Sequence, residues 1–226
     1  MDSALSSLRT WALRAVFLVP PIVVLLAALP RLTSGAALEA AFPVPSYMTV
    51  DRALPIKAYR TTAKALAGAD SADGEAQIAR SRAAYLSGDM GPNIIAIADN
   101  GLSHSPTSAT GWTLLAALRA PVDRARAADA MSVTLELAPH DYYLAAWQAR
   151  VAAPLWADLS PESRDGAARQ MRLLWSDTSL HHNIRSILAT TGGPSLVTYA
   201  MRNDLDGLRA LNRMVARERL GLPNTN

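Results

Sequence analysis

From residue 59 onward, apolar residues recur at spacings of three and four, which is the repeat of an amphipathic α-helix. Within residues 74–86, for example, Ile78, Arg82 and Tyr85 follow one another at this spacing and therefore share a helix face. Turns that contain Gly, Pro or Ser separate such segments. The pattern predicts ten helices, at about 59–67, 74–86, 93–102, 108–118, 123–137, 141–153, 161–175, 180–189, 194–201 and 204–220.

Residues that favour helix ends stand at several of these boundaries. Ser160 is a natural N-cap because its hydroxyl can accept a hydrogen bond from the first turn, and Pro161 suits the first helical position. Asp141 and Ser179 are expected to cap the helices that follow them. Short apolar runs such as 94–97 are ambiguous, but no segment shows the sustained alternation of a half-buried strand. We therefore predict an all-α domain.

The N-terminus has a different pattern, a continuous apolar run from Ala15 to Leu29 that Arg9 and Arg14 precede. Extended to residues 11–32, the segment has 22 residues and would form a helix about 33 Å long, close to the thickness of a bilayer core. The preceding arginines favour a cytoplasmic N-terminus. A signal peptide has a similar layout. We expect a retained transmembrane helix, with a cleaved signal or a buried core helix as alternatives.

These patterns divide the chain into four parts. Residues 1–36 are expected to form a cytoplasmic stub with the transmembrane anchor, or else a signal peptide. Residues 37–58, which contain three prolines, are expected to be an extended linker. The all-α domain then spans 59–220, and 221–226 form a tail. This topology predicts a single-pass protein of the bacterial inner membrane with its C-terminal domain in the periplasm.

The composition narrows the chemistry open to the chain. It has no cysteine, which excludes disulfides, thiol nucleophiles and cysteine metal sites. Of the formal net charge of +3, the first 36 residues carry +2 from three Arg and one Asp, which leaves +1 for the rest. The basic composition is therefore no sign of nucleic-acid binding. Two lysines stand against 20 arginines, which with abundant alanine is typical of a GC-rich bacterial genome.

A weak internal repeat is visible in the middle of the chain. Pro106 and Pro139 stand 33 residues apart, and each separates two predicted helices. Around Pro139, a small residue, an apolar helix end and the proline lead into the next helix, and this turn resembles the closing turn of a tetratricopeptide repeat. The resemblance covers about residues 74–153. It implies antiparallel helix pairs that present side chains to a partner, and an unrelated helical bundle is the alternative.

Individual positions agree with this register to different degrees. Tyr85 falls where the first repeat would carry its aromatic residue, and Ala127 or Ala128 falls at the small-residue position of the second. Arg82, however, stands where the first repeat would carry a small residue. The layout of anchor, linker and degenerate repeat domain also resembles small accessory proteins encoded with exopolysaccharide assembly systems in alphaproteobacteria. That resemblance implies a helper of membrane-bound polymerising or exporting machinery.

Candidate catalytic and metal-binding residues do not combine into a complete site. His181 and His182 are adjacent on a predicted helix, so their side chains point about 100° apart, and no nearby His-x-x-x-His or Glu-x-x-His motif completes a metal site. Ser195 lacks the second glycine of a nucleophile elbow. Residues 204–207 resemble only part of a calcium loop. We expect a non-catalytic protein without a cofactor or metal.

Aromatic residues offer a better candidate for an interaction surface. Tyr142, Tyr143 and Trp147 belong to one predicted helix, and Trp147 follows Tyr143 by four residues, so that these two share a face. Core packing would also explain them, because tryptophan supplies much of the burial in a small α-helical domain. If the three are exposed, they suit contact with a protein or a glycan, and we take them as candidate partner-binding residues.

The last predicted helix carries a basic stripe. Arg209, Arg213 and Arg217 recur at every fourth position, while Leu208, Leu211 and Val215 occupy another side. A solvated face is the ordinary explanation of such a stripe. The functional alternative is docking onto an acidic partner, an anionic polysaccharide or lipid headgroups. The three arginines form the second set of candidate partner-binding residues.

These features together favour a membrane-anchored extracytoplasmic scaffold or accessory protein that binds another protein, with a polysaccharide synthesis or export system as the most specific setting. An anionic polysaccharide is a further candidate partner, whereas nucleic acid is not expected. A periplasmic glycan-active enzyme is a second hypothesis, which a close pair of carboxylates in an aromatic cleft would favour. A structural subunit of a larger membrane complex is a third, which a large exposed apolar patch would favour.

Overall fold

The computed structural model of this protein describes residues 55–219, with side chains to residue 216. This part is all-α and contains no strand. Each of the ten predicted helices is present within it, and two short 3-10 helices, η1 and η2, are added. The elements are α3 (Ile56–Ala65), η1 (Leu66–Gly68), α4 (Gly74–Leu86), α5 (Pro92–His104), α6 (Ala109–Arg119), α7 (Arg124–Leu137), α8 (Tyr142–Ala152), α9 (Pro161–Ser176), η2 (Thr178–Leu180), α10 (His181–Leu188), α11 (Gly193–Ala200) and α12 (Leu205–Arg219).

The predicted N-terminal anchor, 11–32, lies outside the described residues. Among residues 55–219, no helix combines the length and the apolar character that a membrane span requires. The first described helix, α3, begins at Ile56 rather than near residue 59. Pro55 explains the early start, because it lies in an extended conformation before the helix and its carbonyl accepts a hydrogen bond from Ala58 N at 2.8 Å.

Two of the three predicted helix caps are confirmed. The Asp141 carboxylate accepts hydrogen bonds from Tyr143 N at 2.8 Å and Leu144 N at 3.1 Å, and the Ser160 hydroxyl accepts one from the backbone N–H at position 163.

The predicted cap at Ser179 is wrong. Ser179 lies inside η2, where its hydroxyl and its backbone N–H both donate to Asp177, at 2.7 and 2.8 Å. The helix that follows, α10, has no side-chain cap. The physical reason is that Asp177 caps η2, which runs directly into α10, so Ser179 lies within the helical turn and donates its own hydroxyl to Asp177.

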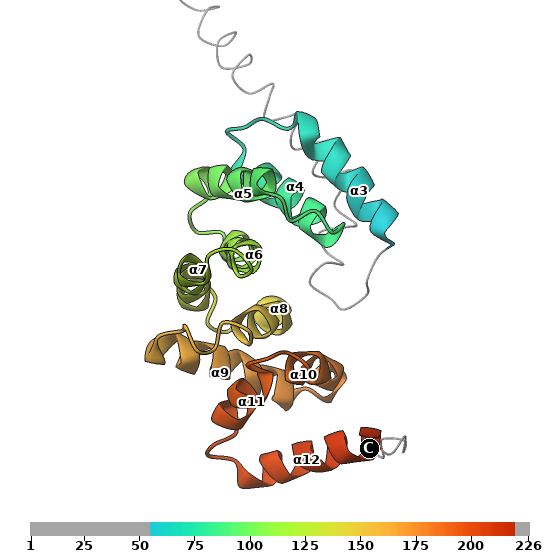
Figure 1. The fold of residues 1–226 in the computed structure, drawn as a ribbon, viewed down its shortest axis with the longest axis vertical. Coiled ribbons are helices and arrows are strands. Elements are labelled where there is room, and N and C mark those ends of the chain that lie inside the picture. Colours follow the sequence, from blue (N-terminus) through green and yellow to red (C-terminus); the bar gives the residue numbers. More distant parts are fainter. Residues whose placement is uncertain (1–54, 220–226) are drawn as a thin grey trace, which may run out of the picture.

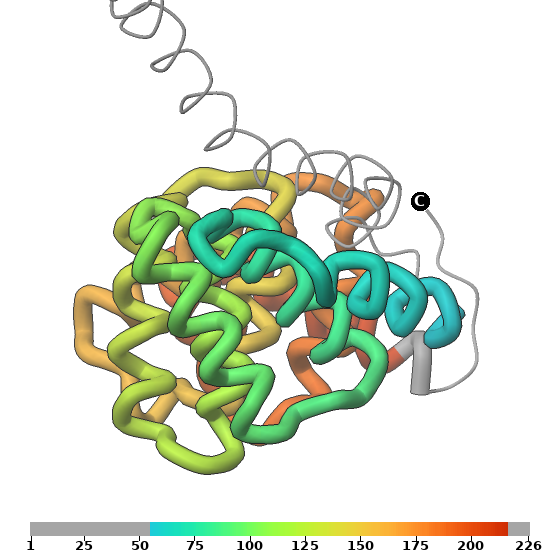
Figure 2. Tube along the Cα trace, turned by 90° about the horizontal axis from the view of Figure 1, so that it is seen from above, coloured from blue at the N-terminus to red at the C-terminus, as the bar shows by residue number. Residues whose placement is uncertain are grey.

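The helices form hairpins that stack into two layers. The first helices of successive pairs, α4, α6, α8 and α10, pack against one another and lie toward the right of Figure 1, while α5, α7, α9 and α11 lie toward its left. α3 covers α4 at one end of the stack, and α12 lies at the other end (Figure 1). Seen along the stack in Figure 2, the hairpins lie behind one another. The described part therefore has the general form of a helical-repeat bundle.

Close contact between α4 and α5 depends on two glycines. A Cβ atom on Gly101 would lie 2.8 Å from Ile78 Cγ1 and 3.0 Å from the carbonyl oxygen of Gly74, and a Cβ atom on Gly74 would lie 2.6 Å from the carbonyl oxygen of Gly101. These distances are shorter than van der Waals contact. The two helices can therefore pack at this distance only because neither position carries a side chain.

Buried hydrogen bonds join the next three helices. The hydroxyl of Thr134 on α7 lies 2.8 Å from the hydroxyl of Thr113 on α6 and accepts a hydrogen bond from Gln148 Nε2 on α8 at 3.0 Å. Thr113, Thr134 and Gln148 are completely buried. Because buried polar groups need partners, this cluster fixes how α6, α7 and α8 are aligned.

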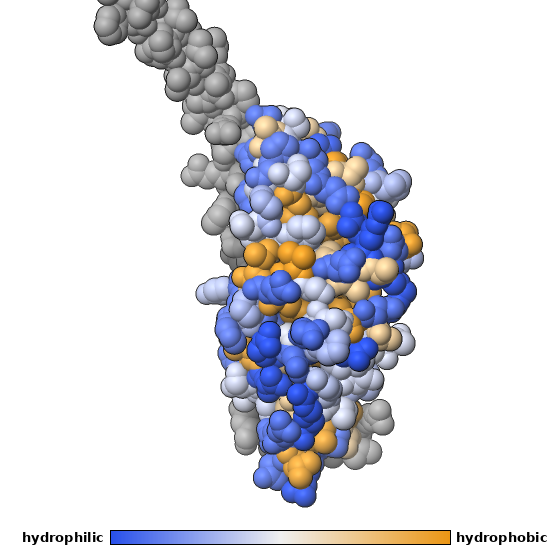
Figure 3. Space-filling model, turned by 90° about the vertical axis from the view of Figure 1, so that its left-hand side faces the viewer, coloured by the Kyte–Doolittle hydropathy of each residue, from blue (hydrophilic) through white to orange (hydrophobic). Residues whose placement is uncertain are grey.

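Apolar packing continues through the whole stack. One cluster of buried side chains extends from Ile78 on α4 to Leu211 on α12. Many of its members are alanines, which let neighbouring helices approach closely. Seen from the side of α7 and α9, the surface is largely hydrophilic, with hydrophobic atoms gathered in small groups (Figure 3).

Candidate functional site

A cavity of about 570 Å³ opens on the layer formed by α4, α6, α8 and α10. Its floor consists of two small side chains, Ala117 on α6 and Ala120 directly after that helix. Larger side chains flank it, from α4 on one side and from α8 with residues 179–183 on the other. The hollow exists because alanines occupy the middle helix while its neighbours carry arginine, tyrosine and tryptophan. We call it the groove cavity.

Arg82 of α4 forms part of the wall of the groove cavity, although the residue is only 6% exposed. Its guanidinium lies over the indole of Trp147, 4.5 Å from the ring centroid, which is a cation–π contact. Its Nε atom is buried without a hydrogen-bond partner, and no carboxylate among the described side chains forms an ion pair with it. Burial lowers the pKa of Arg82 to about 10, so the group remains a cation at neutral pH.

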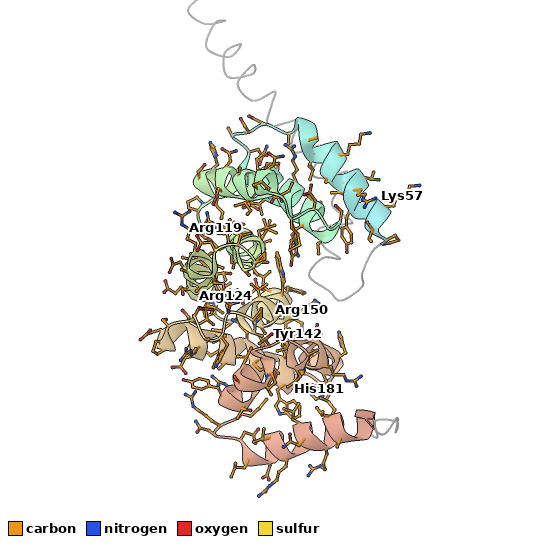
Figure 4. The ribbon with its side chains drawn as sticks, in the orientation of Figure 1. Lys57, Arg119, Arg124, Tyr142, Arg150 and His181 are labelled. Carbon is orange, nitrogen blue, oxygen red and sulfur yellow. The ribbon has the colours of Figure 1, made fainter. Side chains whose placement is uncertain are left out.

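A second arginine, Arg150 of α8, also lines the groove cavity but is exposed. Figure 4 shows Arg150 and Tyr142 on α8, near α10. Burial raises the pKa of the Tyr85 phenol on the opposite wall, and the charge of Arg150 partly offsets that rise. The described lining includes neither Asp nor Glu. Asp177 reaches the rim through Tyr142 but does not line the cavity, so the lining carries two cations and no carboxylate, which favours an anionic ligand.

The three predicted aromatic residues come together at this cavity. Trp147 is partly buried against the core. Tyr142 and Tyr143 stand at the rim, 42% and 63% exposed, with their rings edge to face at a centroid distance of 5.8 Å. A partly exposed cluster of this kind provides apolar contact area together with phenol hydroxyls.

The phenol of Tyr142 is held in place by residues that precede α10. Its hydroxyl donates a hydrogen bond to the Asp177 carboxylate. This bond lowers the pKa of Asp177, to which Ser179 also donates, and it raises the pKa of Tyr142. The contact connects α8 to the start of α10, so the rim of the groove cavity is fixed on this side.

The basic stripe is located elsewhere, on α12 at the end of the stack (Figure 1). Arg209 and Arg213 are exposed, and Arg209 forms a 2.9 Å ion pair with Asp206 one turn earlier. The side chain of Arg217 lies outside the described residues. Neither Arg209 nor Arg213 lines the groove cavity. The structure therefore separates the two predicted sets of partner-binding residues.

Arg82 and Arg150 were not among the predicted site residues, although the sequence carries a sign of them. The helices α4, α6 and α8 begin at residues 74, 109 and 142, which are 35 and 33 residues apart. Arg82, Ala117 and Arg150 are each the ninth residue of their helix. Equivalent positions in stacked hairpins face the same side. The arginine at position 82, where the repeat pattern would carry a small residue, is therefore a sequence sign of the cavity.

The histidines of α10 have local structural partners. The ring of His181 stacks on Trp175 at a centroid distance of 4.7 Å, and its Nε2 lies 3.0 Å from the carbonyl oxygen of that residue. His182 lines the groove cavity, with Nδ1 at 2.8 Å from Ser179 O. Within the described part, no three His, Asp or Glu side chains are grouped as metal ligands.

The groove cavity thus combines an aromatic rim, a floor of small apolar side chains and two cations. Such an arrangement suits binding, because an apolar pocket with a few polar groups holds and orients a ligand. No protein-family model, curated protein or solved structure matches this chain.

Proposed function

We propose that this chain is a non-catalytic binding protein that captures a protein partner in the groove cavity and acts as a membrane-anchored extracytoplasmic scaffold or accessory subunit. The observation that carries the proposal is Arg82, a buried cation that faces an aromatic-rimmed cavity and has no carboxylate partner among the described residues. Apolar contact area beside a charged anchor is typical of the centre of a protein interface.

The stacked hairpins support the tetratricopeptide-like version of this proposal. In such a stack the first helix of each pair contributes to one continuous surface, and the walls of the groove cavity come from α4, α6, α8 and α10 in this way. A surface built from several helices suits an extended partner segment better than a small metabolite. A polysaccharide synthesis or export complex is the most specific setting that we propose for the partner.

The N-terminal apolar segment supplies the second half of the proposal. If residues 11–32 remain as a transmembrane helix, the α domain is confined beside partners in the same membrane. Confinement raises the effective concentration of the partner, so even a weak groove contact would be occupied. The protein would then be located in the bacterial inner membrane, with the described helices in the periplasm.

The glycan-active enzyme receives no support from the groove cavity. Hydrolysis of a glycosidic bond ordinarily uses two carboxyl groups that flank the bond. The lining of this cavity, taken over the described residues, has no Asp or Glu at all. Two arginines at the same place would stabilise an anion, not donate or accept the proton that the reaction needs.

Photo-crosslinking in native membranes tests the proposal. A benzoylphenylalanine replaces Tyr143, which is 63% exposed at the rim, and a matched control replaces Glu136, which is exposed on the outer helix α7. We expect a protein partner to be crosslinked at the rim position only. Equal capture from both positions, or no capture from either, would overturn the proposed role of the groove.

Mass spectrometry of the same preparation tests the anchor. We expect an intact N-terminus that includes residues 11–32, because a retained anchor keeps them. A mature N-terminus near Ala37 would show that the segment is a cleaved signal and that the protein is released into the periplasm.

A further inference from the structure

Arg82 is in an environment that normally excludes an unpaired charge. The residue is 6% exposed, and its Nε atom has no hydrogen-bond partner in the described part of the chain. Burial of a cation is unfavourable unless an anion or several hydrogen bonds compensate it. The contact with Trp147 offsets only part of that cost, since a cation–π interaction is weaker than a charge-assisted hydrogen bond. The residue therefore has unused capacity to bind an anion.

The groove cavity gives an anion access to this cation. Arg82 lines one wall, and Arg150, at the equivalent ninth position of α8, lines the other. Ala117, at the same position of the intervening α6, is too small to separate them. An anion that enters the cavity therefore comes to a lining that carries both charges, and the charge of Arg82, largely shielded from water, is screened less than that of the exposed Arg150.

The rest of the lining indicates what must accompany the anion. Most of the remaining groups are apolar, among them Ala120, Ala146, Val151 and Leu180, together with the faces of the aromatic rings. The neutral polar groups are the phenol hydroxyls of the three tyrosines and the polar side chains at residues 179–183. A neutral sugar would bring no anion to the two guanidinium groups, and its hydroxyls that face the apolar part of the lining would stay unsatisfied, which weakens binding. An apolar ligand with a single acidic group fits this surface better.

We propose that the groove cavity binds an apolar segment of the partner protein that carries one carboxylate, with that carboxylate paired to Arg82 and the flanking apolar side chains packed on Trp147, Tyr142 and Tyr143. This inference rests on the proposed function and specifies the chemistry of the partner. The guanidinium is suited to the task because its planar donors match the two oxygens of a carboxylate. Arg150 attracts the acidic group and adds a weaker, solvent-screened contact.

Selection from a peptide library tests this chemistry before the partner is identified. The full-length chain, held in lipid nanodiscs, is used to select binders from phage-displayed random dodecapeptides, in parallel with the Arg82→Met variant. We expect the wild type to enrich sequences in which one Asp or Glu lies among apolar residues, and the variant to lose that acidic preference. Enrichment without an acidic residue, or no enrichment, would overturn the inference.

Affinity measurements then separate the two arginines. For the best selected peptide, we expect Arg82→Met to weaken binding roughly 10- to 100-fold, because it removes a buried charge-assisted contact. Arg150→Gln should weaken it only about two- to five-fold, because that contact is exposed. A matched peptide with Gln in place of its acidic residue should bind both the wild type and Arg82→Met equally weakly. Equal losses for the two variants would contradict the assigned roles.

The melting temperature of the Arg82 variant shows whether a loss of binding results from the missing charge or from a loss of stability. If Arg82 serves a ligand, Arg82→Met should keep or raise the melting temperature of the free protein, because an apolar side chain of similar length replaces a buried cation that no described carboxylate pairs with. If Arg82 is only structural, the variant should melt at a lower temperature. Should Arg82→Met fail to fold, Arg82→Gln takes its place, and loss of the acidic preference is expected for it as well, because glutamine is polar but uncharged.

Three further outcomes distinguish failure of this inference from failure of the proposed function. Binding of uronate-containing oligosaccharides, with no acidic peptide selected, would replace the protein segment by an anionic glycan and overturn the inference. If a partner is crosslinked at position 143 but the selected peptides lack an acidic residue, the proposed function is retained. Only the inference that the partner segment carries a carboxylate is then overturned. Conversely, if acidic peptides bind through Arg82 but no membrane partner is crosslinked, the carboxylate-binding site is supported and the proposed scaffold role is overturned.

Discussion

The groove cavity and the terminal helix α12 both carry arginines on helices, yet the two regions use them differently. Arg82 is buried against Trp147 and has no ion pair with a described carboxylate. Arg209 is exposed and pairs with Asp206 on its own helix, where both side chains are more than half exposed. An exposed charge with a partner on the same helix contributes little to stability or binding. A buried charge without a partner lowers the stability of the free protein, and an anion that pairs with it contributes strongly to binding.

The difference shows which arginine pattern has predictive value. The regular stripe of Arg209 and its neighbours is conspicuous in the sequence, but solvent screens it. Arg82 is a single arginine in an alanine-rich segment, and in the folded protein it is buried against Trp147. Regular spacing of charges thus indicates a helix face, while burial decides which charge can select a ligand.

The largest expected effect concerns the packing that holds the groove region together and has no counterpart at α12. Gly101→Leu should destabilise the fold by about 3 kcal/mol, because its side chain would overlap Ile78 and the backbone at Gly74. Thermal unfolding followed by circular dichroism measures the change. As controls, Leu at the exposed positions Ala96 on α5 and Ala216 on α12 should shift stability by less than about 0.5 kcal/mol. Equal effects at Gly101 and Ala216 would remove the distinction between the two regions.

A smaller loss is expected from the buried hydrogen bonds beside the groove. Thr134→Val should reduce the free energy of unfolding by about 2 kcal/mol, because Gln148 Nε2 and the hydroxyl of Thr113 lose a buried partner. Chemical denaturation measures it. The double variant with Thr113→Val should lose less than the sum of the two single changes, since both remove the same interaction. Strict additivity would show that the two hydroxyls do not act together.

Charge reversal on α12 should have a weaker effect on binding than any change at Arg82. Replacing Arg209, Arg213 and Arg217 by Glu should leave the helical content intact and reduce partner capture about threefold, mainly through slower and less salt-sensitive association. Capture at several salt concentrations measures this. Unchanged capture would exclude the stripe from the interface, and a loss as large as that of Arg82→Met would make α12 a principal contact.

The smallest expected effect is a pH dependence at the rim. The hydrogen bond from Tyr142 lowers the pKa of Asp177 in the folded protein. A lowered folded pKa means that this contribution to stability is present above the ordinary carboxyl pKa of about 3.9, and that it is lost as the pH falls below that value toward the folded pKa. Tyr142→Phe should raise the pKa of Asp177 and weaken this dependence, as measured by NMR titration of the carboxyl carbon. An unchanged pKa would contradict the role of the phenol.

Local patterns were sufficient to predict the helices and most of their ends. All ten helices follow from the three-and-four spacing of apolar residues, and the caps at Asp141 and Ser160 follow from the chemistry of short polar side chains. The error at Ser179 arose because the helical turn begins two residues earlier, with Asp177 as its cap and Ser179 as a donor to that carboxylate. The added 3-10 turn depends on local turn geometry, which spacing alone does not determine.

The candidate site was only partly visible in the sequence. Tyr142, Tyr143 and Trp147 were selected as an aromatic group, and each of them lines the groove cavity. That choice did not include Arg82 and Arg150, because nothing in their neighbouring residues marks them as a pair. They lie 68 positions apart in the printed sequence, at residues 82 and 150. Only the packing of α4, α6 and α8 into one layer brings them to a single cavity.

By itself, the sequence determined the all-α class, the positions of the helices, the exclusion of cysteine chemistry and a candidate aromatic surface, since each depends on residue type or short-range spacing. Only the tertiary structure decided which charges are buried, which aromatic rings reach solvent and where a cavity opens. The physical reason is that burial and cavity shape depend on neighbours distant in sequence. An alanine at position 117 becomes significant only when an arginine stands on either side of it.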